Sequence, residues 1–262
     1  MITIAVTNQK GGVAKTTTAL NLAVGLAKSG YRVLAVDLDP QAHFTMGLGV
    51  NSSDVPVERT VASLFRGGTL PELLLPTVEP NVRLLPANID LAEEVENLAS
   101  VVWREEKLAR ALPAVREDFD YVITDNGPNF GVLFANAIEA AQKILVPTKL
   151  SLFAVDGLES LLRTIRRVKR DQENYDLRIL RTVVRGHGKE QQDKVWQLLT
   201  PLSDRILETQ IRDTVGVERS QSPDEDGEAK AMVVVNQGAS SGRAAQDYWN
   251  LVKEVLQLWP AR

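Results

Sequence analysis

Residues 10–17 of the chain read Lys10-Gly11-Gly12-Val13-Ala14-Lys15-Thr16-Thr17, a glycine-rich turn that ends in a lysine and two threonines. The turn follows the strand-like run Ile2–Val6 and opens the helical segment Thr16–Ser29, after which Gly30 is a natural stop. The backbone N–H groups of such a turn and the positive end of the helix dipole together form a cradle for oxyanions. The order of strand, turn and helix therefore predicts a phosphate-binding loop.

The side chains of this loop predict its cofactors. In a phosphate loop, a lysine reaches the β- and γ-phosphates and the hydroxyl that follows it ligands Mg²⁺. Lys15 and Thr16 occupy these two places. The loop is not the ordinary G-x-x-x-x-G-K-[ST], because Gln9 replaces the first glycine and Lys10 adds a second lysine. On the sequence alone, Lys10 could also be an ordinary exposed lysine before a glycine turn, without a role in binding.

Short, β-branched apolar runs alternate with helical segments along most of the chain. Such alternation predicts an α/β fold, a mostly parallel twisted sheet with helices on both faces, and we expect one domain over residues 1–262. The expected strands are Ile2–Val6, Arg32–Val36, Val82–Leu85, Tyr121–Thr124, Ile144–Val146, Leu177–Val184 and Met232–Val235. The expected helices are Thr16–Ser29, Arg104–Val115, Phe153–Arg170, Glu190–Leu199 and Arg243–Leu258.

Three aspartates follow two of the expected strands. Asp37 and Asp39 follow the second strand, and Asp125 follows the fourth. A lone aspartate at a strand end most often caps the next turn, but the carboxyl ends of parallel strands meet at one edge of the sheet, where ligands bind. Because three carboxylates converge on the edge that carries the phosphate loop, the pattern favours work on magnesium and water.

Composition excludes several classes of protein. The chain has no cysteine, which rules out disulfides, thiolate metal sites and a cysteine nucleophile. The formal charge of −4 argues against a protein that coats nucleic acid with its whole surface, although residues 163–189 are locally basic. The chain starts at its first strand and no apolar run approaches the roughly 20 residues that span a bilayer, so we expect a cytoplasmic protein without a signal peptide.

Four motifs together resemble one known family. The pattern Lys-Gly-Gly-x-x-Lys-Thr-Thr of residues 10–17 resembles the deviant Walker A motif of the ParA/MinD group of ATPases, and Thr7–Lys10 is similar to the ParA (Soj) branch. Over nearly the whole chain the likeness continues, in a first switch, a third-strand signature and a Walker B strand: Asp37–Gln41, Leu84–Asn88 and Asp120–Asp125. These motifs are highly specific in combination.

The resemblance implies an ATP-dependent molecular switch. Members of the family dimerise with ATP, bind DNA without sequence preference and partition or position a chromosome, plasmid or protein cargo. It also implies slow hydrolysis that is stimulated by an adaptor of the ParB type with a basic N-terminal tail, and association with the nucleoid when ATP is bound. The implied cofactors are ATP or ADP and Mg²⁺.

The resemblance also assigns roles to residues. Lys10 would cross to the phosphates of a partner subunit, Asp39 would position the attacking water, and Asp37 would support the metal shell. The implied catalytic residues are Lys10, Lys15 and Asp39; the nucleotide-binding residues are Lys10, Gly11, Gly12, Val13, Ala14, Lys15, Thr16 and Thr17; the metal-binding residues are Thr16, Asp37 and Asp125. For DNA we expect Arg163, Arg166, Arg167, Arg170, Arg185, Lys189, Arg212 and Arg219, although the arginines of residues 163–170 could equally form an ordinary solvated helix face.

The chain departs from the family pattern at three places. Ala14 stands where most relatives have a glycine, at a position that we expect to be left-handed, and this predicts slower or weaker nucleotide handling. The second switch reads Asp125-Asn126-Gly127-Pro128-Asn129 where relatives usually have two consecutive prolines, so this loop is expected to be more flexible. Gly216 falls where the family has its second DNA-contacting arginine, which makes Arg212 and Arg219 substitutes and not matches.

Two other functions stay open on the sequence. A MinD-like positioning ATPase would need a basic amphipathic C-terminal helix, but Tyr248–Trp259 carries Lys253 as its one basic residue and is interpreted as a docked helix. A metabolic phosphate-loop enzyme, such as a ligase or kinase, would need an acceptor pocket that no motif marks. The cargo and the adaptor are not visible in the sequence.

Overall fold

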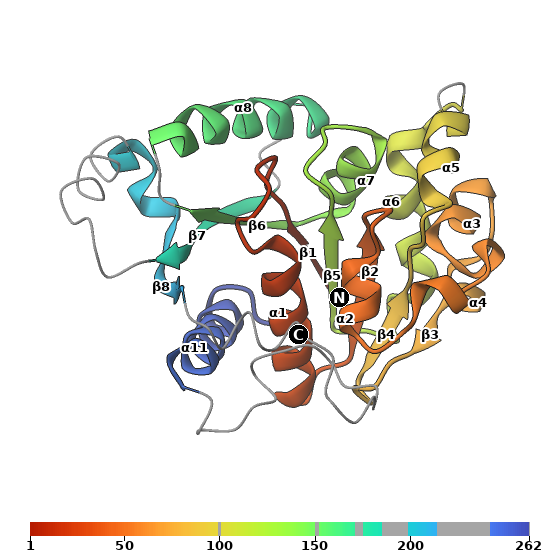
Figure 1. Cartoon of the computed structure of the whole chain (residues 1–262), viewed down its shortest axis with the longest axis horizontal. Helices are drawn as coiled ribbons and strands as arrows, with labels where there is room; N and C mark the ends of the chain where they lie inside the picture. The colour runs from red at the N-terminus through yellow and green to blue at the C-terminus, as the bar shows by residue number, and fades with distance from the viewer. Residues whose placement is uncertain (99–100, 150–151, 171–174, 185–198, 214–241, 262) are drawn as a thin grey trace.

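A mostly parallel β-sheet organises the computed structural model (Figure 1), which describes residues 1–98, 101–149, 152–170, 175–184, 199–213 and 242–261. Within these ranges the sheet has eight strands in the order β3-β4-β2-β5-β1-β6-β7-β8. Every neighbouring pair is parallel except the short edge strand β3, which runs antiparallel to β4. The strands are β1 (Ile2–Val6), β2 (Val33–Leu38), β3 (Leu75–Pro76), β4 (Val82–Leu85), β5 (Tyr121–Asn126), β6 (Lys143–Lys149), β7 (Asp176–Val184) and β8 (Ile206–Arg212).

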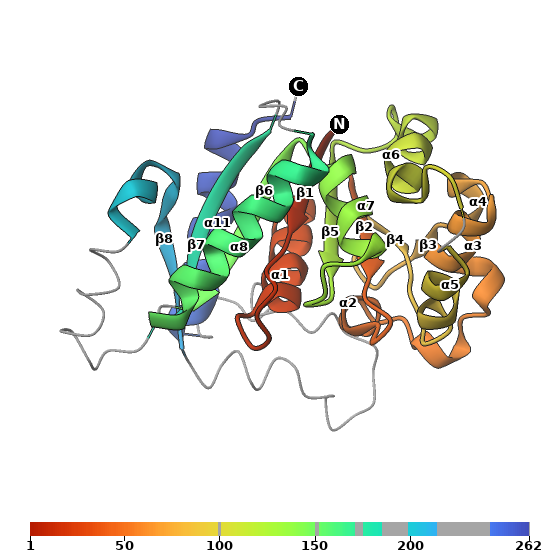
Figure 2. The same ribbon diagram turned by 90° about the horizontal axis from the view of Figure 1, so that it is seen from above.

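Helices cover both faces of this sheet. Helices α1 and α11 lie on one face and α7 and α8 on the other, as Figures 1 and 2 show. The α-helices are α1 (Lys15–Lys28), α2 (His43–Gly47), α3 (Val61–Arg66), α4 (Leu70–Leu73), α5 (Leu91–Asn97), α6 (Lys107–Ala111), α7 (Val132–Ala140), α8 (Leu152–Val168) and α11 (Gly242–Leu258). Short 3₁₀ turns lie at Ser52–Asp54, Val57–Arg59, Arg104–Glu106, Leu112–Val115 and Thr200–Arg205.

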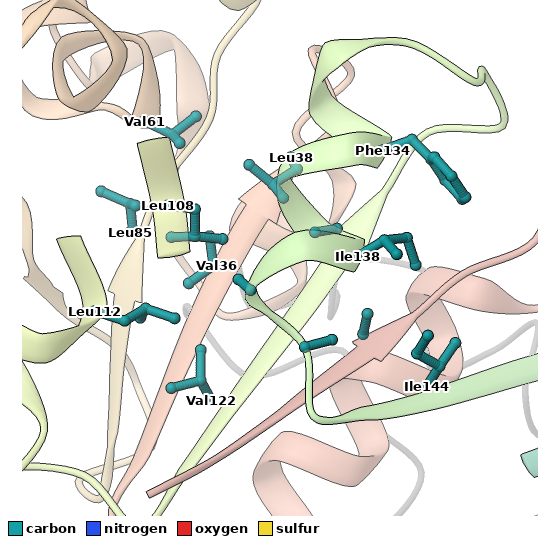
Figure 3. Packing of buried hydrophobic residues seen from close by; sticks show 14 of the residues in the cluster. Val36, Leu38, Val61, Leu85, Leu108, Leu112, Val122, Phe134, Ile138 and Ile144 are labelled. Carbon is teal, nitrogen blue, oxygen red and sulfur yellow. The ribbon is translucent and has the colours of Figure 1, made fainter. Parts of the chain in front are cut away.

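Alternating side chains of the central strands divide the core into two layers. In β2, Leu34, Val36 and Leu38 pack toward α3, α6 and α7, where Figure 3 shows Val36 and Leu38 near Leu108 and Val61. Val33 and Ala35 point to the other face, toward α1 and α11. Because successive side chains of a strand alternate between faces, Asp37 lies on the α1 side of the sheet.

Six of the expected strands are confirmed, with errors at their ends. The predicted ends at Val36 and Thr124 were wrong, because β2 continues to Leu38 and β5 to Asn126. Asp37 and Asp125 therefore lie inside the sheet, and they face each other in register on neighbouring strands. The expected strand Met232–Val235 lies outside the described residues.

Helix prediction succeeded for three segments, of which α8 and α11 are strongly amphipathic. The helices expected at Thr16–Ser29, Phe153–Arg170 and Arg243–Leu258 are confirmed, while Arg104–Val115 is α6 flanked by two 3₁₀ turns. Glu190–Leu199 lies almost wholly outside the described residues. Strand β8 and helix α7 were not predicted; α7 is apolar around most of its circumference, so it shows no polar stripe that would reveal its period.

Candidate nucleotide site

The predicted phosphate loop joins β1 to α1 at the carboxyl edge of the sheet. Gly12 has φ +68° and Ala14 has φ 63° and ψ 38°, so both residues are left-handed. The expectation that position 14 needs a left-handed backbone is confirmed. Alanine in this conformation costs on the order of 1 kcal/mol relative to glycine. No atom lies within 4 Å of where a Cβ on Gly11 or Gly12 would be, so the loop is open on this side among the described residues.

Two buried side chains hold this loop in place. The Asn8 side chain donates to the carbonyl of Pro147 at 2.8 Å and accepts from the Lys10 backbone N–H at 3.0 Å. The Thr182 hydroxyl donates to the carbonyl of Val13 at 2.9 Å. The ends of β6 and β7 therefore fix both sides of the glycine turn, and the backbone of the loop is already organised.

Lys15 is the first residue of α1 and is partly buried. Its ammonium donates to the carbonyl of Lys10 at 3.2 Å, so the side chain folds back over the loop. Burial lowers its pKa, while the charges of Asp125 and Asp39 oppose that shift. A cation held over a glycine turn in this way is placed to meet phosphate oxygens.

Asp125 is the least satisfied polar group at this edge. It is 1% exposed, and neither of its carboxylate oxygens has a hydrogen-bond partner of ordinary geometry among the described residues. Burial raises its pKa well above the usual range and the Asp37 charge adds to this, whereas the nearby Thr16 hydroxyl and Lys15 favour the charged form. A buried carboxylate without donors is costly unless a ligand supplies them.

Asp37 is as deeply buried but is held by the protein. Its Oδ2 accepts from the backbone N–H and the hydroxyl of Thr45, both at 2.8 Å, and its Oδ1 accepts from the backbone N–H of Asp39 at 3.0 Å. Burial raises the pKa of Asp37 to about 7, although these hydrogen bonds act in the other direction. Three of about four acceptor positions are filled, so Asp37 has little capacity left for direct work on a metal shell.

Asp39 lies at the open side of the edge. Its Oδ1 accepts from the backbone N–H of Gln41 at 3.0 Å. A Cβ on Gly127 would lie 3.3 Å from the Cγ and Oδ2 of Asp39, so the first and second switches touch here. The glycine leaves room for the Asp39 carboxylate that a larger residue at position 127 would restrict.

The donor set fits a magnesium nucleotide. Mg²⁺ usually binds through one or two protein groups plus phosphate and water oxygens, and it is seldom enclosed by protein alone. The described residues hold no group of three or more His, Cys, Asp or Glu side chains arranged around one point. Thr16 and the bare Asp125 carboxylate would hold the ion, Asp125 through water, while Lys15 and the loop N–H groups would hold the phosphates.

Comparison with known proteins gives the family. The family model described as "AAA domain" matches residues 1–179. The chain is 38% identical to the sporulation initiation inhibitor protein Soj of Bacillus subtilis over 220 residues, which cover 78% of this chain and 86% of Soj. It is 36% identical to the chromosome partitioning protein ParA of Myxococcus xanthus over 222 residues, covering 78% and 77%. The chain belongs to the ParA/Soj family of phosphate-loop ATPases.

The solved structures share the fold of this ParA/Soj-family chain. A cobyrinic acid a,c-diamide synthase from Mycobacterium smegmatis, crystallised with an ATP analogue and magnesium, superposes with a TM-score of 0.79 at 33% identity. The match covers 99% of this chain and 96% of the synthase chain. The same architecture therefore occurs in proteins whose names point to different reactions, and fold alone does not assign the activity.

The predicted DNA-binding residues of this family member divide into three groups. Arg163, Arg166 and Arg167 are exposed on α8, and none of them forms an ion pair with another described residue. Arg170 pairs with Glu106 at 2.8 Å, and Arg212 forms a two-pronged ion pair with the nearly buried Asp247 of α11. The other three, Arg185, Lys189 and Arg219, lie outside the described residues.

The C-terminal helix of this ParA/Soj-family chain is docked, as expected. Tyr248, Leu251, Val252 and Val255 are buried, and Val252 packs so closely on α1 that a Cβ on Gly25 would lie 2.4 Å from it. The apolar face of α11 is therefore covered by the protein. None of the helices within the described ranges is long and apolar enough to cross a bilayer.

Several residues that shape the site were not predicted from the sequence. Asn8 and Thr182 hold the loop, and Thr45 holds Asp37. Gly127 was placed in the second switch, but its position beside Asp39 was not foreseen. Asn8 lies in the quoted family motif but has no general signature of its own. Thr45 and Thr182 act through contacts that are distant in the sequence, and no local pattern marks such residues.

Proposed function

We propose that this chain is an ATP-driven partition or positioning switch, which binds ATP and ADP with Mg²⁺ and hydrolyses ATP slowly. The observation that carries the proposal is the buried Asp125 carboxylate, which lies near Thr16 and Lys15 at the end of the phosphate loop and has no hydrogen-bond partner of ordinary geometry among the described residues. Membership of the ParA/Soj family and the magnesium-bound nucleotide in a structural neighbour support the cofactors.

In this proposal each side chain of the edge has one task. Bound magnesium would offset the negative charge that develops on the phosphate oxygens. Lys15 and the loop N–H groups orient the triphosphate, and Asp125 accepts from the water shell of the ion. Asp39, which is exposed enough to meet solvent, directs the attacking water. Asp37 holds the backbone of Asp39 in place.

Dimerisation is the second part of the proposal. Lys10 begins the glycine turn, and its backbone is fixed by Asn8, so its side chain starts from a defined point. We infer that Lys10 reaches the phosphates of a second copy of the chain when ATP is bound. A cation from the partner offsets the repulsion between two triphosphates that face each other.

The third part concerns DNA. The exposed arginines of α8, which have no ion pair with another described residue, support contact with DNA, because arginine contacts to phosphates release the counterions condensed on the DNA. Arg212 contributes less than the sequence suggested, since Asp247 already occupies its guanidinium group. The proposed partners are a second copy of the chain, non-specific DNA and a ParB-type adaptor with a basic N-terminal tail, and the ATP-bound form would associate with the nucleoid.

Solution mass in the two nucleotide states tests the switch. We expect the chain to be a monomer with ADP. With ATP and Mg²⁺ we expect a dimer, which is measured most clearly in an Asp39→Ala variant because its hydrolysis should be slower. Lys10→Ala should remain monomeric with ATP, whereas the control Lys28→Ala, at the far end of α1, should dimerise normally. A mass that does not respond to nucleotide in the parent protein counts against the proposal.

Retention on DNA at rising salt tests the surface. The variant Arg166→Glu with Arg167→Glu should lose ATP-dependent retention, since it reverses two charges on the exposed face of α8. The matched control is Arg83→Glu with Arg116→Glu, which makes the same charge change at exposed positions away from α8. Equal retention of both double variants would remove α8 from the DNA surface.

A small-molecule ligase is the competing function, because a neighbour at 33% identity is named a diamide synthase. The partition proposal expects DNA plus a basic adaptor peptide to raise ATP turnover. A ligase would instead turn over ATP in the presence of an acid and an amine donor, and would ignore DNA.

A further inference from the structure

The segment after β4 has no role in the function proposed above. It belongs to the motif Leu84–Asn88, and the structure fixes it firmly. The Pro86 carbonyl accepts from the Val61 N–H at 2.8 Å, and the Asn88 side chain donates to the Val55 carbonyl at 3.1 Å. Between them, the Ala87 N–H donates to the hydroxyl oxygen of Thr45 at 3.1 Å. Ala87 of this motif therefore contacts α2, which follows the first switch in the chain.

Backbone N–H donors fix the direction of two hydrogen bonds at Thr45, and the ionised form of Asp37 fixes the third. A backbone N–H can only donate, so the Thr45 oxygen accepts from Ala87. The hydroxyl hydrogen of Thr45 is then available for Asp37, whose Oδ2 lies 2.8 Å away. Asp37 in turn accepts from the N–H of Asp39 at 3.0 Å. Ala87, Thr45, Asp37 and Asp39 are thus linked by consecutive hydrogen bonds, and Asp37 accepts from both of its neighbours in this series.

Asp39 itself depends on this series of hydrogen bonds. Its backbone is tied to Asp37, and its carbonyl accepts from the N–H of Ala42, which has a left-handed φ of 55°. Strained, non-glycine turns of this kind persist where the surroundings fix them. Thr45 is completely buried, and it supplies two of the three donors that hold Asp37.

We propose that Thr45 is a positioning residue for ATP hydrolysis, which sets the place of Asp39 through Asp37 and takes its own place from the segment after β4. This rests on the proposed function, because it assigns Asp39 to the attacking water. Thr45 would act on the transition state of ATP hydrolysis and not on the binding of ATP. Lys15, Thr16 and the loop bind the nucleotide without help from Thr45.

Two substitutions separate the hydroxyl from the methyl group of Thr45. Thr45→Val keeps the shape and removes the hydroxyl, while Thr45→Ser keeps the hydroxyl and removes the methyl. Loss of a hydrogen bond to a charged group predicts that Thr45→Val lowers kcat by about 10- to 100-fold. The Kd for ATP with Mg²⁺ should change by less than about threefold, and Thr45→Ser should restore most of the turnover.

A role of Thr45 in packing alone predicts the opposite order. At a fully buried position, Thr45→Ser leaves a small cavity and Thr45→Val does not, so packing alone would make the serine variant the worse one. Thr3→Val is the matched control: Thr3 is 1% exposed and its hydroxyl has no partner among the described residues. It should keep the wild-type kcat.

Amide hydrogen exchange gives a readout that does not depend on turnover. The Ala87 and Asp39 N–H groups should exchange at least about tenfold faster in Thr45→Val than in wild type, and at the wild-type rate in Thr45→Ser. Unchanged exchange or unchanged kcat in Thr45→Val, with normal wild-type hydrolysis, overturns the role of Thr45 alone. If the wild-type protein hydrolyses no ATP, the proposed function itself fails, and the role of Thr45 fails with it.

Discussion

The buried polar side chains of strand β5 are hydrogen-bonded at one end of the strand and lack hydrogen-bond partners at the other. At its amino end, the Tyr121 hydroxyl donates to the Trp259 carbonyl at 2.7 Å and accepts from the Ala261 N–H at 2.9 Å, so the C-terminal segment closes over it. At its carboxyl end, both oxygens of Asp125 and the side-chain oxygen of Asn126 are buried without partners among the described residues. Only four positions separate Tyr121 from Asp125.

This difference in hydrogen bonding shows that one end of β5 serves stability and the other end serves the proposed function. Buried polar groups are usually hydrogen-bonded, and those that are not raise the free energy of the folded state. The amino end follows this rule and contributes to stability. The carboxyl end of β5 does not follow this rule, and it lies beside the phosphate loop. A bound magnesium nucleotide would supply the missing hydrogen-bond partners, so nucleotide binding would lower the free energy of the folded state again.

Removal of the Asp125 charge should have the largest effect. Asp125→Asn should raise the free energy of unfolding without nucleotide by about 1–3 kcal/mol, because it removes a carboxyl group whose burial opposes its charged form more than Thr16 and Lys15 favour that form. It should also weaken magnesium-dependent nucleotide binding by about 10- to 100-fold. Urea unfolding with and without ATP and Mg²⁺ measures both effects.

Asp120 provides the control at the opposite end of the strand. It accepts from the N–H and the guanidinium group of Arg32 at 2.8–3.2 Å, and this partner lowers its pKa. Asp120→Asn should therefore destabilise slightly, by less than about 1 kcal/mol for an exposed pair, and leave nucleotide binding intact. If both variants shift stability in the same direction, the contrast between the two ends of β5 is wrong.

The pH dependence of stability should reveal the same unsatisfied end. Burial raises the pKa of Asp37 from 3.8 to about 7, and it raises that of Asp125 as well, so the folded chain binds more protons than the unfolded chain in this window. The free energy of unfolding should then fall as pH rises from about 4 to about 7, by at most about 1.4 kcal/mol per pH unit for one carboxyl group. We expect urea unfolding without Mg²⁺ to show this slope, and Asp125→Asn to reduce it. A stability that rises with pH over this range contradicts the prediction.

A substitution at the amino end of β5, where the polar groups are hydrogen-bonded, should change the stability of the protein and leave ATP binding unchanged. Tyr121→Phe leaves the Trp259 carbonyl and the Ala261 N–H without their partner, which should cost about 1–2 kcal/mol and lower Tm by a few degrees. ATP affinity should not change, because Tyr121 lies at the far edge of the sheet from the loop. The control is Tyr31→Phe, since the Tyr31 ring packs edge-on against Tyr121 at 5.2 Å. Loss of ATP binding in Tyr121→Phe would show that the two ends are coupled.

These two ends were not equally predictable from the sequence. The phosphate loop and the Asp125 strand end have local signatures, so the loop, the central strands and the left-handed Ala14 were foreseen. The partners of Tyr121 lie about 140 positions away, and those of Thr45 include Ala87, so no local pattern reveals them. Helix α7 was missed because it is mostly apolar and mostly buried, so it has almost no polar face. Single-domain folding over residues 1–262 and the roles of the site residues stay predictions.

The smallest effect on stability is expected at Ala14. Ala14→Gly relieves a left-handed alanine, worth on the order of 1 kcal/mol, but it also gives the unfolded chain more freedom, which costs about 0.4–1 kcal/mol. The two terms nearly cancel, so the free energy of unfolding should change by less than about 0.5 kcal/mol.

Nucleotide handling should respond more clearly than stability to this change. The Ala14 methyl group sits in the turn that would surround the phosphates, next to Lys15. Its removal should raise ATP affinity or turnover by a few fold, up to about tenfold for 1.4 kcal/mol of relieved crowding. Titration with ATP and Mg²⁺ and steady-state turnover measure this directly, with Gly12→Ala as the reverse variant at the other left-handed position. If Ala14→Gly leaves affinity and turnover unchanged while Gly12→Ala lowers both, the methyl group at position 14 is tolerated by the nucleotide, and the departure from the family pattern has no functional cost.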